Sequence, residues 1–308
     1  MTVHPDLSER TCYHKYEVEP GLFTPGKFAE LDPKICLDEI GVASDLSGVR
    51  ALDIGAWDGP FTFELERRGA QVTAMDIQDP DVTVFNAVKK IKNSSATYVR
   101  SSVYDAVRES LGIFDLVLFA GVYYHLKNPV LALQRIRRLL ADQGILFIEG
   151  SSTTDYLAAR LRQELNLPRS KIDALANVVD RLPVSYFDIE QELGGWSNWW
   201  YPTTGCLEAV LLDSGFRNVS CELKPSAFNN YLYRRLMGRA EADPGNPQPD
   251  EQTREHEVLT EEYTSTNLSA ARRLIARLPP GLKQETKRVR RTIRKTRRTY
   301  RQIPVELP

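Results

Sequence analysis

The chain has 308 residues, a formal net charge of −1 and an ordinary apolar fraction, which suits one domain with a full core and some appended segments. No apolar run approaches the length of a membrane span, and the first residues lack a signal-peptide pattern. The four cysteines are scattered without a CxxC pair and the four histidines are dispersed, so we expect reduced thiols, no metal site and a cytoplasmic protein.

Strand and helix patterns alternate from residue 49 to about residue 150. Five segments are apolar or β-branched on both faces, as buried parallel strands require: Val49–Ile54, Gln71–Asp76, Thr97–Ser101, Phe114–Ala120 and Gly144–Glu149. The sequence predicts helices over Pro33–Ile40, Pro129–Leu140, about Tyr156–Leu165, about Ser170–Arg181 and about Gly205–Ser214. Arg135, Arg137 and Arg138 fall on the side of their helix that we expect to face solvent.

Two further strands, near Asn218–Leu223 and Tyr231–Arg235, would close the sheet in an antiparallel pair. Together these elements predict a Rossmann-like α/β fold with a seven-strand doubly wound sheet over residues 49–238. Residues 151 to about 204 are unlike the rest of the domain, and we expect them to form an inserted cap over the substrate. The N-terminal segment, residues 1–48, is expected to cover the same site.

The C-terminal part differs from the domain in charge. Residues 239–264 are rich in acidic residues, Pro, Gly and Gln, which predicts a linker. Residues 265–308 are predicted to form a basic helical tail, in which positions 283–308 hold ten Lys or Arg against two Asp or Glu. Residues 283–301 could bind RNA or an anionic membrane surface, or could fold onto the acidic body; a solvated or self-associating helix is the simpler alternative.

Two strands end in residues suited to a nucleoside-containing cofactor. The first strand leads into Gly55, where the lack of a Cβ lets the backbone approach a ligand. The second ends about twenty residues later in Asp76, whose carboxylate can accept two hydrogen bonds from a ribose diol. Trp57 and Pro60 stand where a dinucleotide-binding turn needs glycines, so the pattern is not the dinucleotide one.

The form Asp53-Ile-Gly-Ala-Trp-Asp-Gly59 resembles motif I of the class I S-adenosylmethionine (SAM) methyltransferases. Gly121-Val-Tyr-Tyr-His125 resembles the G-V-x-Y-H segment of the subgroup that includes the carboxymethoxyuridine-forming methyltransferases of the transfer RNA wobble position. Tyr13-His14 and Thr24-Pro25-Gly26 resemble the YH…TPG element of the same subgroup. The resemblance covers about residues 10–235 and implies SAM as the cofactor and methyl transfer as the reaction.

One departure bears on the cofactor. In the transfer RNA enzymes, an arginine late in the domain helps to hold the extra carboxylate of carboxy-SAM, near an R-N-V-Y-F-I-P-type segment. The equivalent region here, Ser197–Pro202, has no arginine. Because an unpaired buried carboxylate is costly, we expect ordinary SAM and ordinary methyl transfer.

The resemblance assigns roles to residues around the predicted edge of the sheet. Asp53 and Asp58 would border the methionine end of SAM, and Asp76 would bind the ribose hydroxyls unless it only caps a turn. Val103 and Tyr104 would cover the adenine ring against Ile77. The expected cofactor site comprises Asp53, Gly55, Ala56, Trp57, Asp58, Asp76, Ile77, Val103, Tyr104 and Gly121.

The catalytic residues are expected just beyond the fourth and fifth strands. His125, with a reference pKa near 6.5, suits a general base toward a hydroxyl, although a structural histidine is the alternative. Tyr124 would orient SAM or substrate, and Glu149 would be a second base, a substrate ligand or a structural residue. The substrate would contact an aromatic wall and its neighbours, unless the aromatics only fill a core: His14, Asn198, Trp199 and Trp200.

We therefore predict a SAM-dependent methyltransferase that acts on a hydroxyl of a small molecule or glycan, with His125 as general base. One alternative is an RNA-modifying methyltransferase of the wobble-uridine type that uses the basic tail as an RNA anchor. Another is a SAM-fold binding protein without catalysis, tethered by its tail.

Overall fold

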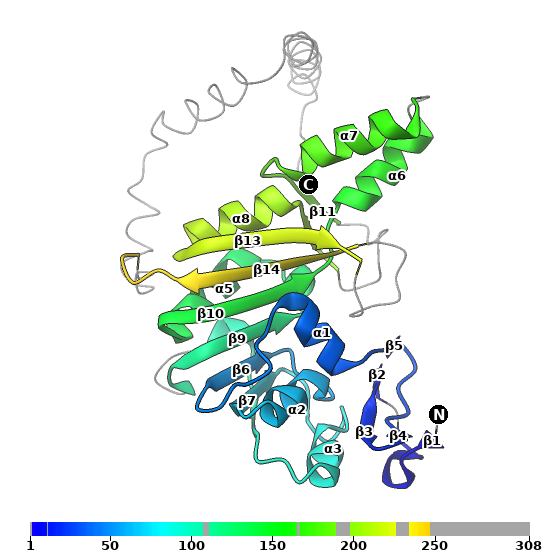
Figure 1. Cartoon of the computed structure of the whole chain (residues 1–308), viewed down its shortest axis with the longest axis vertical. Coiled ribbons are helices and arrows are strands. Elements are labelled where there is room, and N and C mark those ends of the chain that lie inside the picture. Colours follow the sequence, from blue (N-terminus) through cyan, green and yellow to red (C-terminus); the bar gives the residue numbers. More distant parts are fainter. Residues whose placement is uncertain are drawn as a thin grey trace, which may run out of the picture. The chain divides into compact units, whose positions relative to one another are not determined.

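The computed structural model describes residues 2–10, 12–106, 111–164, 167–188, 198–225 and 234–246 (Figure 1). All of them fall within the unit Met1–Gln248. The predicted basic tail at 265–308 lies outside the described residues, and so does the linker from residue 247 onward.

A seven-stranded sheet forms the centre, in the order β13-β14-β10-β9-β6-β7-β8 (Figure 1). The pairs that join β8, β7, β6, β9 and β10 are parallel, whereas β14 is antiparallel to both β10 and β13. This arrangement confirms the predicted seven-strand α/β fold. The strands are β6 (Arg50–Ile54), β7 (Gln71–Asp76), β8 (Thr97–Arg100), β9 (Phe114–Ala120), β10 (Leu140–Gly150), β13 (Phe216–Lys224) and β14 (Arg235–Ala242).

Helices pack against both faces of this sheet, because successive strand residues point to opposite faces. Ala51 of β6 lies in a buried cluster with residues of α1, α2 and α3, whereas the next residue, Leu52, lies in a second cluster with residues of α5 and α8. The sheet is therefore doubly wound, as predicted. The helices are α1 (Pro33–Ile40), α2 (Pro60–Arg67), α3 (Phe85–Ile91), α5 (Pro129–Leu139), α6 (Thr154–Glu164), α7 (Arg169–Asp180) and α8 (Thr204–Asp213).

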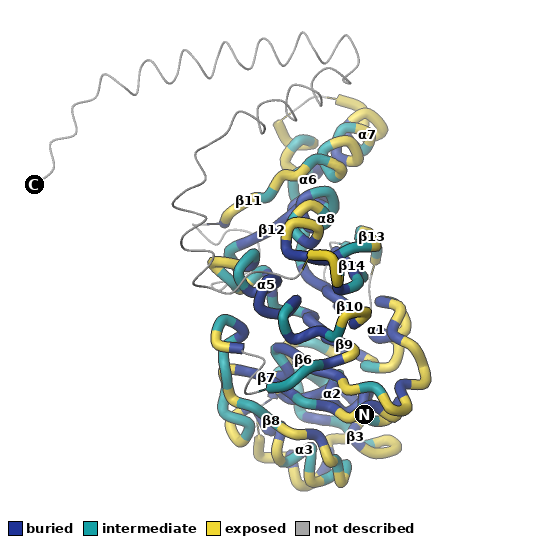
Figure 2. Tube along the Cα trace, turned by 90° about the vertical axis from the view of Figure 1, so that its left-hand side faces the viewer, coloured by how far each residue is buried: buried dark blue, intermediate teal, exposed yellow. Residues whose placement is uncertain are grey.

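Short elements make up much of the N-terminal segment, and others follow β8 and β9 or lie in the cap region. The N-terminal ones are β1 (Thr2–Val3), η1 (Pro5–Leu7), β2 (His14–Lys15), β3 (Glu17–Glu19), β4 (Leu22–Phe23) and β5 (Ala29–Glu30). The others are η2 (Val103–Asp105), η3 (Tyr123–His125), β11 (Ser185–Phe187) and β12 (Trp200–Pro202). In the cap region α6 and α7 consist mainly of exposed and half-buried residues, in contrast to the buried central strands (Figure 2). None of the described helices is long and apolar enough to cross a bilayer.

The last strand extends further along the chain than predicted, and residues 231–233 of the predicted strand lie outside the described residues. β14 begins at Arg235, where the predicted strand ends, and it extends to Ala242, beyond the expected domain boundary at residue 238. The alternation of buried and half-buried residues from 239 to 242 explains the extension, because these residues pair with β10 and β13. The first residues of the predicted linker are therefore part of the sheet.

The arginines of α5 also differ from expectation. Arg135 and Arg137 are buried rather than turned outward, and Arg138 is half-buried. Arg137 donates from Nε to the carbonyl oxygen of Gly215 at 2.8 Å and from Nη2 to that of Asp243 at 2.6 Å. Backbone carbonyls of the β13 and β14 ends thus bind a side chain that helical spacing alone assigns to solvent.

Candidate active site

Asp53 lies near the carboxyl end of β6, below the motif I turn. Its side chain is only 2% exposed and accepts a hydrogen bond from the Thr62 hydroxyl at 2.6 Å. Burial raises the pKa of Asp53 to about 7, although the Thr62 hydrogen bond opposes the shift and the Asp76 carboxylate reinforces it. The carboxylate therefore supports the start of α2 from beneath the motif I turn, and its predicted place beside the methionine end of SAM stays a prediction.

Asp76 ends β7 and holds two turns together. One carboxylate oxygen accepts the Trp57 N–H at 3.0 Å, and the other accepts the Gln78 N–H at 2.9 Å. Trp57 has a φ of 48°, which a bulky residue rarely adopts, so this hydrogen bond helps to keep the motif I turn in a left-handed conformation. Each carboxylate oxygen has more than one acceptor position, so these bonds are compatible with ribose binding.

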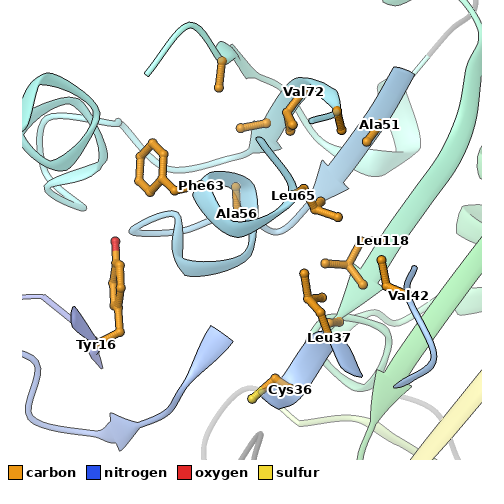
Figure 3. Close-up of a cluster of buried hydrophobic side chains, with 14 of the residues drawn as sticks. Tyr16, Cys36, Leu37, Val42, Ala51, Ala56, Phe63, Leu65, Val72 and Leu118 are labelled. Carbon is orange, nitrogen blue, oxygen red and sulfur yellow. The ribbon is translucent and has the colours of Figure 1, made fainter. Parts of the chain in front are cut away.

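Asp58 binds the N-terminal segment, and its predicted place beside the methionine end of SAM stays a prediction. The carboxylate accepts the backbone N–H groups of Tyr13 at 3.1 Å and His14 at 2.8 Å, and it contacts Nδ1 of His14. Tyr16 donates its hydroxyl to the Asp58 carbonyl oxygen at 2.6 Å. Figure 3 shows the Tyr16 ring directed from the N-terminal segment toward the region of Ala56 and Phe63. His14, a predicted substrate residue, is thus part of this clamp.

Gly55 is needed for a contact within the protein. It has a φ of 83°, and a Cβ built on it would lie 2.2 Å from Cγ2 of Val122, in the segment after β9. Gly121, predicted in the cofactor site, precedes Val122 and donates its N–H to the Glu149 carbonyl oxygen at 3.0 Å. The motif I turn and the segment after β9 are therefore in direct contact.

The residues expected around adenine differ in exposure. Ile77 is 62% exposed and Trp57 is 37% exposed, so both offer apolar surface at this edge. Val103 is buried in η2 and Ala56 is buried in the core. Tyr104 accepts the Asn128 N–H on its hydroxyl at 3.0 Å, which ties η2 to the start of α5.

Tyr124 and His125 lie in η3, directly after β9. Their rings are 4.3 Å apart between centroids, and His125 is exposed whereas Tyr124 is half-buried. Tyr123 is fully buried and donates its hydroxyl to the Ser151 carbonyl oxygen at 2.6 Å. The buried Tyr123 anchors the segment and leaves His125 at the surface of the carboxyl edge.

Glu149 is paired, which argues against its predicted role as a second base. Its side chain is 1% exposed and forms a two-point ion pair with Arg235, whose Nε contacts Oε1 and whose Nη2 lies 3.3 Å from Oε2. Burial opposes the charge of Arg235, but the Glu149 carboxylate outweighs it and raises the pKa of the guanidinium above its usual range. The ion pair occupies both carboxylate oxygens of Glu149, which favours the structural role.

The predicted aromatic wall is divided between core and surface. Trp200 is 7% exposed and packs edge-on against Tyr123 at 5.5 Å, so it fills the core, and Asn198 is also buried. Trp199 is half-buried, and its backbone N–H donates to the Tyr124 carbonyl oxygen at 2.6 Å. Lys127 Nζ lies 4.4 Å from the centroid of the Trp199 ring. Of these three predicted substrate residues, Trp199 alone is more than slightly exposed.

Three contacts at this edge are absent from the sequence-based site: Arg235 with Glu149, Thr62 with Asp53, and Val122 with Gly55. Thr62 follows the motif I turn closely enough to be considered from spacing. Arg235 can be assigned to the site only when β14 is known to pair antiparallel with β10, because this pairing brings the start of β14 beside Glu149 and Ser151. Within the described ranges no cluster of His, Cys, Asp or Glu is suited to a metal ion.

The fold and sequence together define a class. Residues 52–148 match the family described as "Methyltransferase domain". The N-terminal domain of EvdMO1, solved with bound S-adenosylhomocysteine, has the same fold: it aligns with a TM-score of 0.51 and 18% identity over 77% of this chain and 93% of that one. These findings confirm the predicted resemblance to the class I SAM-dependent methyltransferases.

Two curated relatives with known reactions are similar to parts of this chain. A ubiquinone biosynthesis O-methyltransferase of Xanthomonas oryzae pv. oryzae is 32% identical over 118 residues, which are 38% of this chain and 49% of the relative. A tRNA U34 carboxymethyltransferase of Desulforapulum autotrophicum is 25% identical over 183 residues, 59% of this chain and 48% of the relative. The chain thus spans about half the length of the curated relatives it matches.

Proposed function

We propose that this chain is a cytoplasmic enzyme that transfers a methyl group from SAM to a hydroxyl of a small molecule or glycan, with His125 as general base. The observation that carries the proposal is the position of His125, exposed directly after β9 and in ring contact with Tyr124. A base at this place can take the proton of a hydroxyl as it is methylated. The similarity to an O-methyltransferase supports a hydroxyl acceptor.

The residues at the carboxyl edge fit SAM. Asp76 retains acceptor capacity for a ribose diol, and the exposed Ile77 offers apolar surface to the adenine. Gly55, Val103 and Gly121 would line the remainder of the cofactor site. When bound, SAM supplies a methyl group activated by a sulfonium. The protein's part is to hold the acceptor hydroxyl in line, exclude water and accept the proton on the His125 imidazole.

Ordinary SAM is favoured over carboxy-SAM by the state of Arg235. The structure does place an arginine near this edge, although residues 198–202 contain none. However, each of its three guanidinium nitrogens already donates to Glu149, Ser151 or Tyr124. An additional carboxylate would have to compete with Glu149 for this cation, and it would meet the negative charge of Glu149.

A second candidate function is RNA modification. The similarity to the tRNA U34 carboxymethyltransferase extends over a longer part of this chain than the similarity to the O-methyltransferase. In that case the basic segment 283–301 would bind the RNA substrate. The same segment could instead bind an anionic membrane surface and hold the enzyme there.

Transfer of radiolabelled methyl from SAM into an extract of the source cells tests both candidates. Label in small or glycan-sized products, unaffected by RNase, is the expected result. RNase-sensitive label would favour the second candidate. Binding of SAM by calorimetry without any transfer, across extracts from several growth phases, would contradict the proposed enzyme and favour a binding protein.

A further inference from the structure

A buried cation lies beneath Tyr124. Arg235 begins β14 and is only 6% exposed. Besides its two-point pair with Glu149, it donates from Nη1 to the Ser151 hydroxyl at 2.8 Å and from Nη2 to the Tyr124 hydroxyl at 3.4 Å. Its guanidinium carbon lies 5.2 Å from the centre of the Tyr124 ring. One side chain therefore joins β14, the end of β10 and η3.

Stability alone does not account for this arrangement. A buried ion pair often contributes no more than an apolar pair of the same volume, because desolvation offsets the attraction. What the pair does provide is geometry, since a guanidinium held by a carboxylate at two points has a fixed orientation. Tyr124 is the side chain that receives this fixed donor.

The contacts of Tyr124 lead to the proposed reaction site. Its carbonyl oxygen accepts the Trp199 N–H at 2.6 Å, and its ring contacts the His125 ring. The backbone of Glu149 holds the start of the segment, because its carbonyl oxygen accepts the Gly121 N–H at 3.0 Å. The segment 121–125 is thus held at Gly121 by the backbone of Glu149 and at Tyr124 by the guanidinium of Arg235.

We infer that Arg235, neutralised by Glu149, is a positioning residue that fixes Tyr124 and through it sets the places of His125 and Trp199 for methyl transfer. The inference rests on the proposed function. A displacement of about 1 Å in a reacting group can lower a rate by about 100-fold, so a loosely held segment would bind SAM yet transfer methyl groups slowly.

The first test uses amide hydrogen exchange, which needs no acceptor. Arg235→Lys keeps the positive charge but cannot reach Glu149, Ser151 and Tyr124 together. Amides in peptides that cover residues 121–126 and 198–200 are expected to exchange at least about tenfold faster than in the unaltered protein, because their partners are no longer fixed. The matched control is Arg68→Lys: Arg68 is also buried and paired with Glu64 and Asp38, but it lies at the end of α2. Unchanged exchange in Arg235→Lys, or equal acceleration in the control, overturns the inference.

The second test asks whether Arg235 acts through the Tyr124 hydroxyl. Initial rates of methyl transfer into the cell extract at saturating SAM are compared for Arg235→Lys, Tyr124→Phe and the double variant. We expect a loss of about 10- to 100-fold in Arg235→Lys, SAM affinity within about twofold, and a double variant no slower than the slower single variant. Multiplying losses would overturn the inference. Absence of transfer by the unaltered protein would count against the proposed function, while the exchange result would still decide the positioning.

Discussion

The two halves of the carboxyl edge are held by opposite means. In the half formed by β6 and β7, the carboxylates of Asp53, Asp58 and Asp76 mainly accept hydrogen bonds from hydroxyl or backbone N–H groups. In the half formed by β9, β10 and β14, the carboxylate of Glu149 is neutralised by the buried Arg235. All four acids lie at or near the ends of strands, so position alone does not set their role. The difference shows that acids at similar positions in the sheet can have different partners: hydroxyl and backbone N–H groups in one half and a buried cation in the other.

The largest expected effect tests whether the second half alone carries the chemistry. His125→Ala is expected to lower the initial rate of methyl transfer by about 10²–10⁴-fold, the usual contribution of a general base. SAM affinity, measured by calorimetry, is expected to stay within about twofold because the cofactor residues lie mainly in the first half. His4→Ala, which alters a histidine of the N-terminal segment paired with Glu19, serves as the control. An unchanged rate in His125→Ala would remove the imidazole from the mechanism.

The next effect concerns the clamp in the first half. Asp58→Ala removes the acceptor of two backbone N–H groups and of the His14 ring, and it is expected to lower the free energy of unfolding by about 3–5 kcal/mol. Denaturant titration measures the change. Asp45→Ala is the control, because Asp45 is exposed and accepts from the nearby Ser47 N–H. If both variants lose the same stability, the clamp does not hold the segment.

A smaller effect distinguishes the acids by pH. The folded-state pKa of Asp53 is about 7, above the ordinary value of 3.8 for an aspartate side chain. The folded state therefore keeps a proton that the unfolded state loses, and Asp53 makes the protein less stable as pH rises from about 4 to about 7. Asp53→Asn removes this dependence while the amide oxygen can still accept from Thr62. Relative to the unaltered protein, the variant is expected to gain on the order of a few kcal/mol between these pH values.

Denaturant titrations of both proteins at several pH values give this difference directly, and groups common to both cancel. A constant difference across the range would mean that Asp53 ionises normally in the folded protein.

The smallest effect compares two cations above aromatic rings. Lys127 lies 4.4 Å from the centre of the Trp199 ring but is exposed, whereas Arg235 is buried beside Tyr124. Lys127→Met is expected to lower the free energy of unfolding by only about 0.5–1 kcal/mol. It should also leave hydrogen exchange in residues 121–126 unchanged. Accelerated exchange there would show that the ring contact, rather than the buried pair, fixes the segment.

The sequence specifies well what depends on local pattern. β7, β9 and α1 have the predicted bounds because each is a run with a clear hydrophobic pattern and a polar or conformational boundary, such as Gly41 with a φ of 88° after α1. The gathering of Asp53, Asp76 and His125 at one edge also follows from parallel strands.

Other features depend on contacts between distant segments, which no local pattern encodes. Glu149 and Arg235 are 86 residues apart in the sequence, and Asp58 and His14, which are hydrogen-bonded, are 44 residues apart. The burial of Arg137 depends on backbone carbonyls that become available only when β13 and β14 are in place. The sequence pattern ends a strand at Arg235, where β14 in fact begins. A charged residue next to an apolar run marks a strand boundary but does not say which end of the strand it is.

The clamp on Asp58 has a consequence for anyone who divides this chain. Gly26 lies so close to His14 that a Cβ on it would be 2.0 Å from the His14 carbonyl carbon. Residues 13–26 therefore form a compact loop that contacts the motif I turn at Asp58. A chimaera joined at residue 49, where the sheet begins, would take Asp58 from one parent and the loop of residues 13–26 that binds it from the other. A module for recombination with a homologue therefore has to include residues 13–26 together with the strands of the sheet.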